Sequence, residues 1–298
     1  MRVVSLGSGS SGNALFVEAG PQGRTRLLVD AGLSVRTIEQ RLLTISIAPS
    51  QLSGILVTHE HSDHVLGIPM VMKRYAVPII ADARTLEAIK EGIKTGAWRS
   101  DTGEIVPSHN SHMLSEPSNN TDPLFTPFPV GSRRTLGDIE VTSFATSHDA
   151  VAPCGYRLSA DGFRVCIITD TGKVTPEMLK AISRVDLLIL ESNHDRERLL
   201  AGPYPSSLKR RILSASGHLS NAQAASAVRR AWSRNSVRCL WLAHLSRTNN
   251  TPALAITSMR THLQNAGLNL SQVTIAALPP GMGEIWDSSG LWHNLSLF

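Results

Sequence analysis

The feature that most constrains this chain is a cluster of histidines and an aspartate directly after an apolar run. The run Ile55-Leu-Val57 predicts a short buried strand. Four possible metal ligands follow it: His59, His61, Asp63 and His64. Alternate residues after a strand end can point the same way, so the first two histidines can bind one ion while Asp63 and His64 face a second. A polar turn with surface histidines is the alternative, but this density of ligand types favours a metal site.

Composition and charge narrow the class of protein. The chain has 298 residues, and its 42% hydrophobic and 18% charged residues are typical of a globular protein. The net charge of +5 and the pI of about 9.4 suit a polyanionic partner such as nucleic acid, although a solvated arginine-rich surface explains them almost as well. Cys154, Cys166 and Cys239 form no C-x-x-C pair, which disfavours a disulfide framework or a thiolate zinc site and indicates a reducing compartment.

The sequence contains no signal-length or membrane-spanning apolar run. We therefore expect a soluble, cytoplasmic protein that makes no contact with a membrane. Short strands alternate with amphipathic helices along most of the chain, which predicts an α/β layer architecture. The predicted strands are residues 2–6, 13–18, 26–30, 55–57, 77–80, 139–144, 156–158, 164–169, 185–190, 239–243 and 272–277. The predicted helices are residues 34–43, 65–75 with an interruption at Pro69, 83–95, 176–182, 208–213, 221–231 and 252–266.

Two segments lack a clear helix or strand pattern. Gly7-Ser-Gly-Ser-Ser-Gly-Asn13 joins two predicted strands, so we interpret it as a hairpin loop whose amides line the mouth of the site, and not as a phosphate loop that opens a helix. Residues 96–131 are rich in Ser, Asn, Pro and Thr, which predicts a long loop with little structure of its own. His109 and His112 are ligands by type, but the polar context favours exposed side chains. A lid or substrate guide is the alternative role for this loop.

Four later strands also end in polar side chains that suit a metal or catalytic site. They are followed by, or end in, His148, Asp170, Glu191 and His244. Strand ends meet at one edge of a sheet, where α/β folds place their chemistry, so these residues and His59 are expected there together. A two-metal site needs a bridging carboxylate and room for a water. The residues alone cannot divide this set between two ions.

The run from His59 to His64 matches the signature H-x-H-x-D-H and resembles the metallo-β-lactamase superfamily, whose members are mostly two-metal hydrolases. The resemblance implies a single domain over residues 1–298 with a four-layer αββα sandwich and a dinuclear site at the edge of the sheets. It implies the following ligands: His59, His61 and His148 for one metal, Asp63, His64 and His244 for the other, and Asp170 as the bridge. Asp63 would also orient the attacking water, whose pKa two zinc or manganese ions would lower.

Later motifs resemble the phosphodiesterase branch that contains ribonuclease Z. They are Leu190-Glu-Ser-Asn-His-Asp195, Gly217-His-Leu-Ser-Asn221 and Ala243-His-Leu-Ser-Arg247. That resemblance implies that Glu191 orients His218 and stabilises its charge, and that His218 protonates the leaving oxygen as a general acid. The alternative for His218 is a neighbour of a helix cap with no catalytic part.

Together with Ser5-Leu-Gly-Ser-Gly-Ser-Ser-Gly-Asn-Ala14 and the extension to Asn250, these motifs are most similar to the YycJ (WalJ) subfamily. This implies a metal-dependent 5′→3′ DNA exonuclease linked to mismatch repair, which attacks DNA ends with metal-bound hydroxide. Residues 96–131 are longer than the family pattern, and a nucleic-acid-binding β-CASP insertion is absent. Contacts to DNA must then come from loops of the site itself. The candidates for phosphate contact, each as easily explained by loop capping, are Asn193, His194, Ser220, Arg247 and Asn249.

Other functions stay open on the sequence. Within the same fold they are an RNA-processing nuclease, a small cyclic phosphodiesterase and a thioester or lactam hydrolase. The pair Glu191 and His218 favours phosphodiesters over thioesters. A non-catalytic regulatory or DNA-binding module that keeps metal for folding is a different class, but such a module is expected to have lost ligands, and none is missing here.

Overall fold

The computed structural model describes residues 1–100, 102–107, 124–232 and 238–289. It divides the chain into two compact units. Unit 1 comprises residues 1–139, 150–152 and 280–298, and unit 2 comprises residues 140–149 and 153–279. Among the described residues, no helix has both the length and the apolar composition that crossing a membrane requires.

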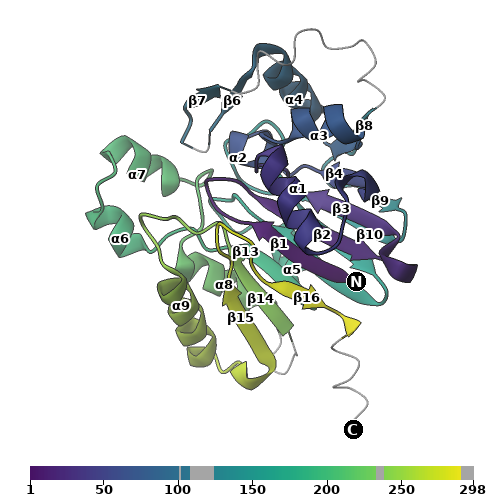
Figure 1. The fold of residues 1–298 in the computed structure, drawn as a ribbon. Coiled ribbons are helices and arrows are strands. Elements are labelled where there is room, and N and C mark those ends of the chain that lie inside the picture. The colour runs from purple at the N-terminus through teal and green to yellow at the C-terminus, as the bar shows by residue number, and fades with distance from the viewer. Residues whose placement is uncertain (101, 108–123, 233–237, 290–298) are drawn as a thin grey trace. The chain divides into compact units, whose positions relative to one another are not determined.

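Unit 1 contains a mixed sheet with the strand order β16-β1-β2-β3-β4-β5-β8 (Figure 1). Its strands are β1 (Arg2–Gly7), β2 (Ala14–Ala19), β3 (Thr25–Val29), β4 (Gly54–Leu56), β5 (Ile79–Ala81), β8 (Phe125–Pro127) and β16 (Ile285–Asp287). Neighbours from β16 to β3 are antiparallel, and neighbours from β3 to β8 are parallel. The carboxyl ends of β3 and β4 therefore lie side by side. The short elements η1 (Pro21–Gly23) and η2 (Pro49–Gln51) are turns of 3₁₀ helix.

The helices of unit 1 bury one apolar face each. They are α1 (Val35–Thr44), α2 (Ser62–Val65), α3 (Ile68–Tyr75) and α4 (Ala83–Thr95). Ser34 caps α1 and Asp82 caps α4 through hydrogen bonds from backbone amides to their side chains. Ile38 of α1, Val71 of α3 and Ile89 of α4 belong to one core with strand residues such as Phe16. This core fixes the position of the turn between β4 and α2.

Unit 2 contains a second mixed sheet, with the strand order β15-β14-β13-β12-β11-β10 (Figure 1). Its strands are β10 (Ile139–Ala145), β11 (Cys154–Ala160), β12 (Phe163–Ile168), β13 (Leu187–Glu191), β14 (Arg238–Ala243) and β15 (Val273–Ala277). β10, β11 and β12 are antiparallel neighbours, whereas β12 to β15 run parallel. The carboxyl ends of β12, β13 and β14 consequently meet at one edge.

The helices of unit 2 follow β12, β13 and β14 in the chain. They are α5 (Pro176–Ile182), α6 (Arg196–Ala201), α7 (Ser206–Ile212), α8 (Asn221–Ala231) and α9 (Pro252–Asn265), and η5 (Leu270–Gln272) follows α9. Met178 of α5, Val228 of α8 and Met259 of α9 join buried strand residues in one core. The predicted alternation of strands and helices is thus confirmed, and the predicted bounds of α4, α5 and α8 agree with those observed.

Two predictions of local structure were wrong. The segment 96–131 contains β6 (Ala97–Arg99), β7 (Ile105–Pro107) and β8, and the first two form an antiparallel hairpin. The predicted helix 65–75 is two helices, α2 and α3, and Pro69 lies in the first turn of α3, where its missing amide hydrogen is not needed. The elements α6, β9 (Arg133–Leu136) and β16 were not predicted. His109 and His112 lie outside the described residues.

Candidate metal centre and catalytic residues

In unit 1, the ligand turn (residues 59–64) follows β4 and continues into α2. Its histidines and Asp63 are each at most 5% exposed. The ring of His59 lies 4.7 Å from that of His61 and 4.1 Å from that of His64, measured between centroids. Burial of so many ionisable side chains within one turn is costly unless they bind partners or a metal. The structure thus brings the sequence-predicted residues of unit 1 together.

Asp30 orients the ligand turn from the end of the neighbouring strand, β3. One of its carboxylate oxygens lies 2.7 Å from Nδ1 of His64, and the other accepts a hydrogen bond of 2.8 Å from the amide of Thr58. The hydroxyl of Thr58 lies 3.0 Å from Nδ1 of His59. Partners at Nδ1 fix the orientation of both rings and leave Nε2 as the nitrogen suited to a metal. Asp30 has a φ of 63°, a left-handed conformation that few non-glycine residues adopt and that aspartate tolerates better than most.

Asn13 connects the glycine–serine loop (residues 7–12) to the ligand turn. Its side-chain amide nitrogen lies 3.2 Å from a carboxylate oxygen of Asp63 and 3.1 Å from Nε2 of His64. Its side-chain oxygen accepts a 2.8 Å hydrogen bond from the amide of Gly9. The loop joins the antiparallel strands β1 and β2, so the hairpin prediction is confirmed.

In unit 2, the polar residues come from separate strands. Asp170 follows β12, Glu191 ends β13 and His244 follows β14, at the adjacent carboxyl ends of three parallel strands. Together with His218, which precedes α8, each offers a ligand atom, and these atoms lie within 4.8 Å of one another. Asp170 and His244 have φ values of 52° and 54°, so both side chains are directed into the cluster by strained backbone.

Glu191 is the centre of this cluster and is completely buried. One carboxylate oxygen lies 2.6 Å from Nδ1 of His218 and 3.3 Å from Nδ1 of His244. The other accepts hydrogen bonds from the amides of Thr171 and Leu219, at 2.9 and 3.1 Å. Burial alone would raise the pKa of the Glu191 carboxyl, but the charge and hydrogen bond of His218 outweigh it and leave that pKa below its usual value. Glu191 is therefore a carboxylate that holds a proton on Nδ1 of His218.

His148 follows β10 and is also buried. Its Nδ1 lies 3.2 Å from the carbonyl oxygen of Gly217, to which it can donate a hydrogen bond. The ring centroids of His148 and His218 are 5.1 Å apart. Next to it, Asp149 forms a two-pronged ion pair with Arg211, which ties the end of β10 to α7. The sequence-predicted residues of unit 2 are thus also brought together.

The candidates for phosphate contact have other surroundings. The side-chain amide of Asn193 donates a 3.0 Å hydrogen bond to the carbonyl oxygen of His244, so it supports a candidate ligand. Ser220 caps α8 in a reciprocal box with Gln223. Four of the five candidates are almost inaccessible and one is exposed: Asn193, His194, Ser220 and Asn249 are at most 6% exposed, and Arg247 is exposed. These contacts favour the supporting alternative for Asn193 and the capping alternative for Ser220.

Several supporting residues were missed by the sequence reasoning. Asp30, Thr58 and Asn13 hold the ligand turn, and the amide of Thr171 holds Glu191. The available signal for Asp30 was that it ends a buried strand and precedes Ala31 and Gly32, as Asp170 precedes Thr171 and Gly172. Both aspartates have a positive φ.

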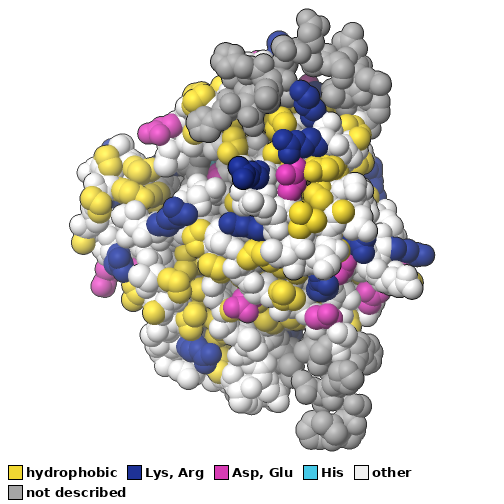
Figure 2. All heavy atoms as spheres, in the orientation of Figure 1, with side chains coloured by type: hydrophobic (Ala, Val, Ile, Leu, Met, Phe, Trp, Pro, Cys, Tyr) yellow, Lys and Arg dark blue, Asp and Glu magenta, His cyan; other side chains and the backbone are white. Residues whose placement is uncertain are grey.

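The donor set of each unit fits divalent metal ions. Unit 1 supplies three imidazoles and one carboxylate, and unit 2 supplies His148, His244 and the carboxylate of Asp170. Imidazole with carboxylate suits zinc and manganese, and hydrogen bonds at Nδ1 are the usual support for ligands that bind through Nε2. On the face shown in Figure 2, Lys and Arg side chains stand among hydrophobic and uncharged ones, and no histidine side chain is visible.

The chain is similar to known proteins over most of its length. Residues 25–244 match the family model described as Beta-lactamase superfamily domain. Exodeoxyribonuclease WalJ of Streptococcus pneumoniae is 37% identical over 265 residues, which cover 89% of this chain and 89% of that protein. Exodeoxyribonuclease YycJ of Bacillus anthracis is 38% identical over 267 residues, or 90% of each chain.

More distant likenesses agree with these matches. A ribonuclease Z of Mycobacterium bovis is 28% identical over 57% of this chain and 63% of its own length. Among solved structures, the metallo-beta-lactamase fold protein YhfI of Bacillus subtilis is similar with a TM-score of 0.65 at 16% sequence identity, covering 96% of this chain and 98% of that one. At this identity the likeness concerns the fold, an α/β sandwich, and agrees with the predicted fold class.

Proposed function

The chain belongs to the metallo-β-lactamase superfamily and, within it, to the family of the WalJ and YycJ exodeoxyribonucleases, metal-dependent hydrolases; we propose that it is a DNA exonuclease that removes nucleotides in the 5′→3′ direction. The observation that carries this proposal is the 37–38% identity over about nine-tenths of both chains. The ribonuclease Z match is shorter and weaker, so an RNA-processing nuclease is the less favoured alternative. We further propose a cytoplasmic role in DNA repair.

We propose that the chain holds two divalent ions, zinc or manganese. His59, His61 and His148 would bind one ion, Asp63, His64 and His244 would bind the other, and Asp170 would bridge them. When bound, such ions polarise a phosphoryl oxygen and lower the pKa of a coordinated water. The supporting observation is the chemistry of the donors, whose rings are oriented at Nδ1 by groups such as Asp30 and Thr58.

The chain's own residues supply the remaining steps of phosphodiester cleavage. Asp63 would accept a hydrogen bond from the attacking water and so orient it. His218 would donate the proton on its Nε2 to the leaving oxygen, because its Nδ1 is held by Glu191 at 2.6 Å. The charge of Glu191, whose pKa lies below the usual range, stabilises the protonated ring before that transfer. This pairing favours a phosphodiester, whose leaving alkoxide needs a proton, over a thioester.

The test uses purified protein loaded with Mn²⁺ or Zn²⁺ and 5′-phosphorylated single-stranded DNA, double-stranded DNA and RNA of the same sequence. We expect stepwise release of nucleotides from the 5′ end of DNA and loss of this activity in Asp63→Ala. His218→Ala should keep its metal but cleave about 10²–10⁴-fold more slowly, the usual contribution of a general acid. His262→Ala, which removes an exposed histidine of α9, is the matched control and should be fully active.

Added imidazole should partly restore His218→Ala, because a small base can occupy the space that the side chain leaves; a purely structural role would not show this rescue. Cleavage of RNA in preference to DNA would move the proposal to the ribonuclease alternative. Hydrolysis of neither nucleic acid by metal-loaded protein would contradict the proposed function and favour a small-molecule substrate.

A further inference from the structure

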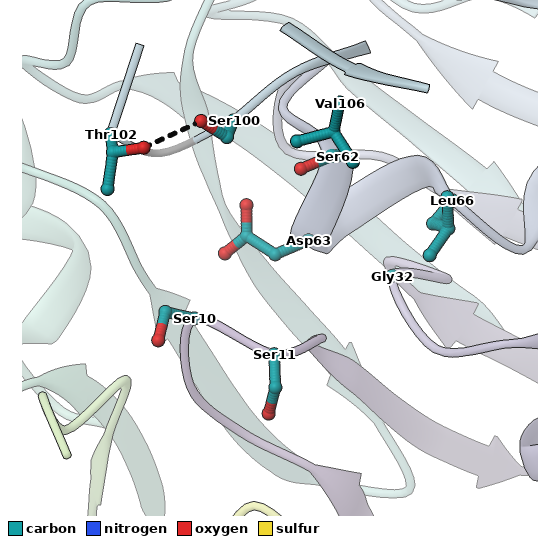
Figure 3. A pocket seen from close by; sticks show the side chains of 9 residues that line it. All are labelled: Ser10, Ser11, Gly32, Ser62, Asp63, Leu66, Ser100, Thr102 and Val106. Atoms are coloured by element: carbon teal, nitrogen blue, oxygen red, sulfur yellow. Dashed lines mark hydrogen bonds between the residues drawn. The ribbon is translucent and has the colours of Figure 1, made fainter. Parts of the chain in front are cut away.

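A pocket of about 360 Å³ opens in unit 1 beside Asp63. Figure 3 shows the Asp63 carboxylate projecting into the space between Ser10 of the glycine–serine loop and the turn that carries Ser100 and Thr102. Leu66 lies at another wall, where α2 ends. The volume falls in the range of about 300–1,000 Å³ that is common for small-molecule sites. The metal ligands proposed above use Asp63 but leave the rest of this pocket without a role.

The hairpin of β6 and β7 forms one wall and is anchored in the core of unit 1. Trp98 of β6 is 2% exposed, and its ring occupies the space above Gly92 of α4, where a Cβ atom would lie 2.3 Å from the ring. Val106 of β7 pairs with Trp98 across the hairpin, so both side chains are on the same face. That face turns Val106 into the pocket, while the neighbouring Ile105 is 68% exposed.

Hydrogen bonds hold the other parts of the wall in place. The hydroxyl of Ser100 lies 2.9 Å from that of Thr102, and the amide of Gly103 donates to the carbonyl oxygen of Ser100 at 2.8 Å. The glycine–serine loop is held through Asn13, whose amide donates to the carbonyl oxygen of Asp63 at 2.7 Å. The walls are therefore set before a ligand arrives, which lowers the entropy lost on binding.

The chemistry of the lining indicates the kind of ligand. Hydroxyl groups such as those of Ser10 and Thr102 both donate and accept hydrogen bonds, and Val106 and Leu66 add an apolar surface. Neither lysine nor arginine belongs to the described lining, and the charged group there is the Asp63 carboxylate. Such a lining suits an uncharged group with polar edges and an apolar face better than it suits a phosphate group. A deoxyribose with its base is a group of this kind.

We propose that this pocket binds the sugar and base of the terminal nucleotide of the DNA strand, next to the phosphodiester that is cleaved at Asp63. This inference rests on the proposed exonuclease function and names the part of the substrate that the chain recognises. A pocket with room for one nucleoside also limits each cleavage to one nucleotide, because the second nucleoside of the strand lies beyond the scissile bond.

The test replaces a residue of the hairpin by one whose larger side chain fills the pocket. Val106→Trp places a bulky ring in the pocket, and Ile105→Trp makes the same change on the opposite, exposed face and is the matched control. Calorimetry on Mn²⁺-loaded protein measures the affinities for thymidine 5′-monophosphate and for inorganic phosphate. We expect Val106→Trp to lower the affinity for thymidine 5′-monophosphate at least about tenfold and to leave the affinity for phosphate unchanged. Ile105→Trp should change neither affinity.

A second arm compares two DNA substrates. One ends in an ordinary nucleotide, and the other ends in a tetrahydrofuran residue, which lacks the base. The wild type should release the ordinary nucleotide at least about tenfold faster than the baseless one, and Val106→Trp should remove this preference. The inference would be overturned if all variants bound thymidine 5′-monophosphate with equal affinity, or if Val106→Trp lowered the affinity for phosphate as much as the affinity for the mononucleotide. If Val106→Trp does not fold, Val106→Ala must lower the affinity for thymidine 5′-monophosphate several-fold. Unchanged affinity in that variant would overturn the inference. Binding of the mononucleotide without cleavage of any DNA would instead contradict the proposed function alone.

Discussion

The two units assemble their polar residues in different ways. In unit 1, the candidate ligands lie in one short turn, and three nearby side chains, Asp30, Thr58 and Asn13, hold them by hydrogen bonds. In unit 2, the residues come from separate strands and are centred on the buried carboxylate of Glu191. The ligand turn thus depends on a few side chains from neighbouring segments. The cluster of unit 2 depends on the register of three parallel strands.

The largest effect is expected from Gly32→Ala in unit 1. A Cβ atom at this position would lie 1.6 Å from the carbonyl oxygen of Asp63, which is backbone and cannot turn aside. The ligand turn would have to shift, at a loss of about 3 kcal/mol in the free energy of unfolding, together with loss of bound metal. Urea denaturation and metal content by mass spectrometry measure the two effects.

Gly162→Ala in unit 2 is the control for this change. Gly162 has a φ of 79° but open space around it, so alanine there should lower the free energy of unfolding by only about 1 kcal/mol. Equal losses of unfolding free energy in the two variants would show that the close approach of Gly32 to the backbone of Asp63 does not constrain the ligand turn.

A smaller effect is expected from Asp30→Asn, which keeps the shape of the side chain but removes its charge. Asp30 contacts Nδ1 of His64 at 2.7 Å, and removing such a supporting carboxylate typically weakens metal binding about 10–100-fold. Competition with a chelator measures the affinity. Unchanged affinity would mean that the ligand turn orients His64 without this partner, and the contrast between the units would then weaken.

The next effect concerns His194 of unit 2, which is completely buried and has no hydrogen-bond partner at either ring nitrogen among the described residues. Burial lowers its pKa from 6.5 to about 4. As the pH falls below 6.5, the unfolded chain therefore binds this proton before the folded chain does, and stability is lost until the pH reaches about 4. His194→Leu should abolish this loss, which amounts to about 2 kcal/mol between pH 7 and pH 5.

The measurement is the free energy of unfolding of both proteins across this pH interval. The difference between wild type and His194→Leu isolates the one histidine from the other titrating groups, which are common to both. A difference that stays constant with pH would show that His194 is not held neutral, and that unit 2 satisfies its buried polar groups as fully as unit 1 does.

The ligand turn was predictable from sequence because its residues are local. His59, His61, Asp63 and His64 follow one apolar run, so their spacing alone indicates metal binding. The helices α4, α5 and α8 were equally local, since each has a cap and an apolar stripe. The likeness to a known family then supplied the proposed roles of residues that no local pattern connects, such as Asp170 and His244.

Other features depend on contacts between distant residues. Asp30 supports His64 across two strands that pair only in the folded sheet, and the sequence could not decide between phosphate contact and loop capping for Asn193, which donates to the backbone of His244. The hairpin of β6 and β7 was predicted as a loop because its strands are only three residues long and lack periodicity. What fixes it is the packing of Trp98 over Gly92, a tertiary contact that the local sequence does not announce.

The central proposal is that the chain holds two divalent ions bridged by Asp170. Electron paramagnetic resonance of protein titrated with Mn²⁺ tests it directly, because two manganese ions that share a bridging carboxylate give an exchange-coupled spectrum. We predict binding of about two ions per chain with this coupling, and loss of the coupling in both His59→Ala and His244→Ala, one variant from each unit. Spectra of isolated ions in the wild type, or coupling that survives either variant, would contradict the account.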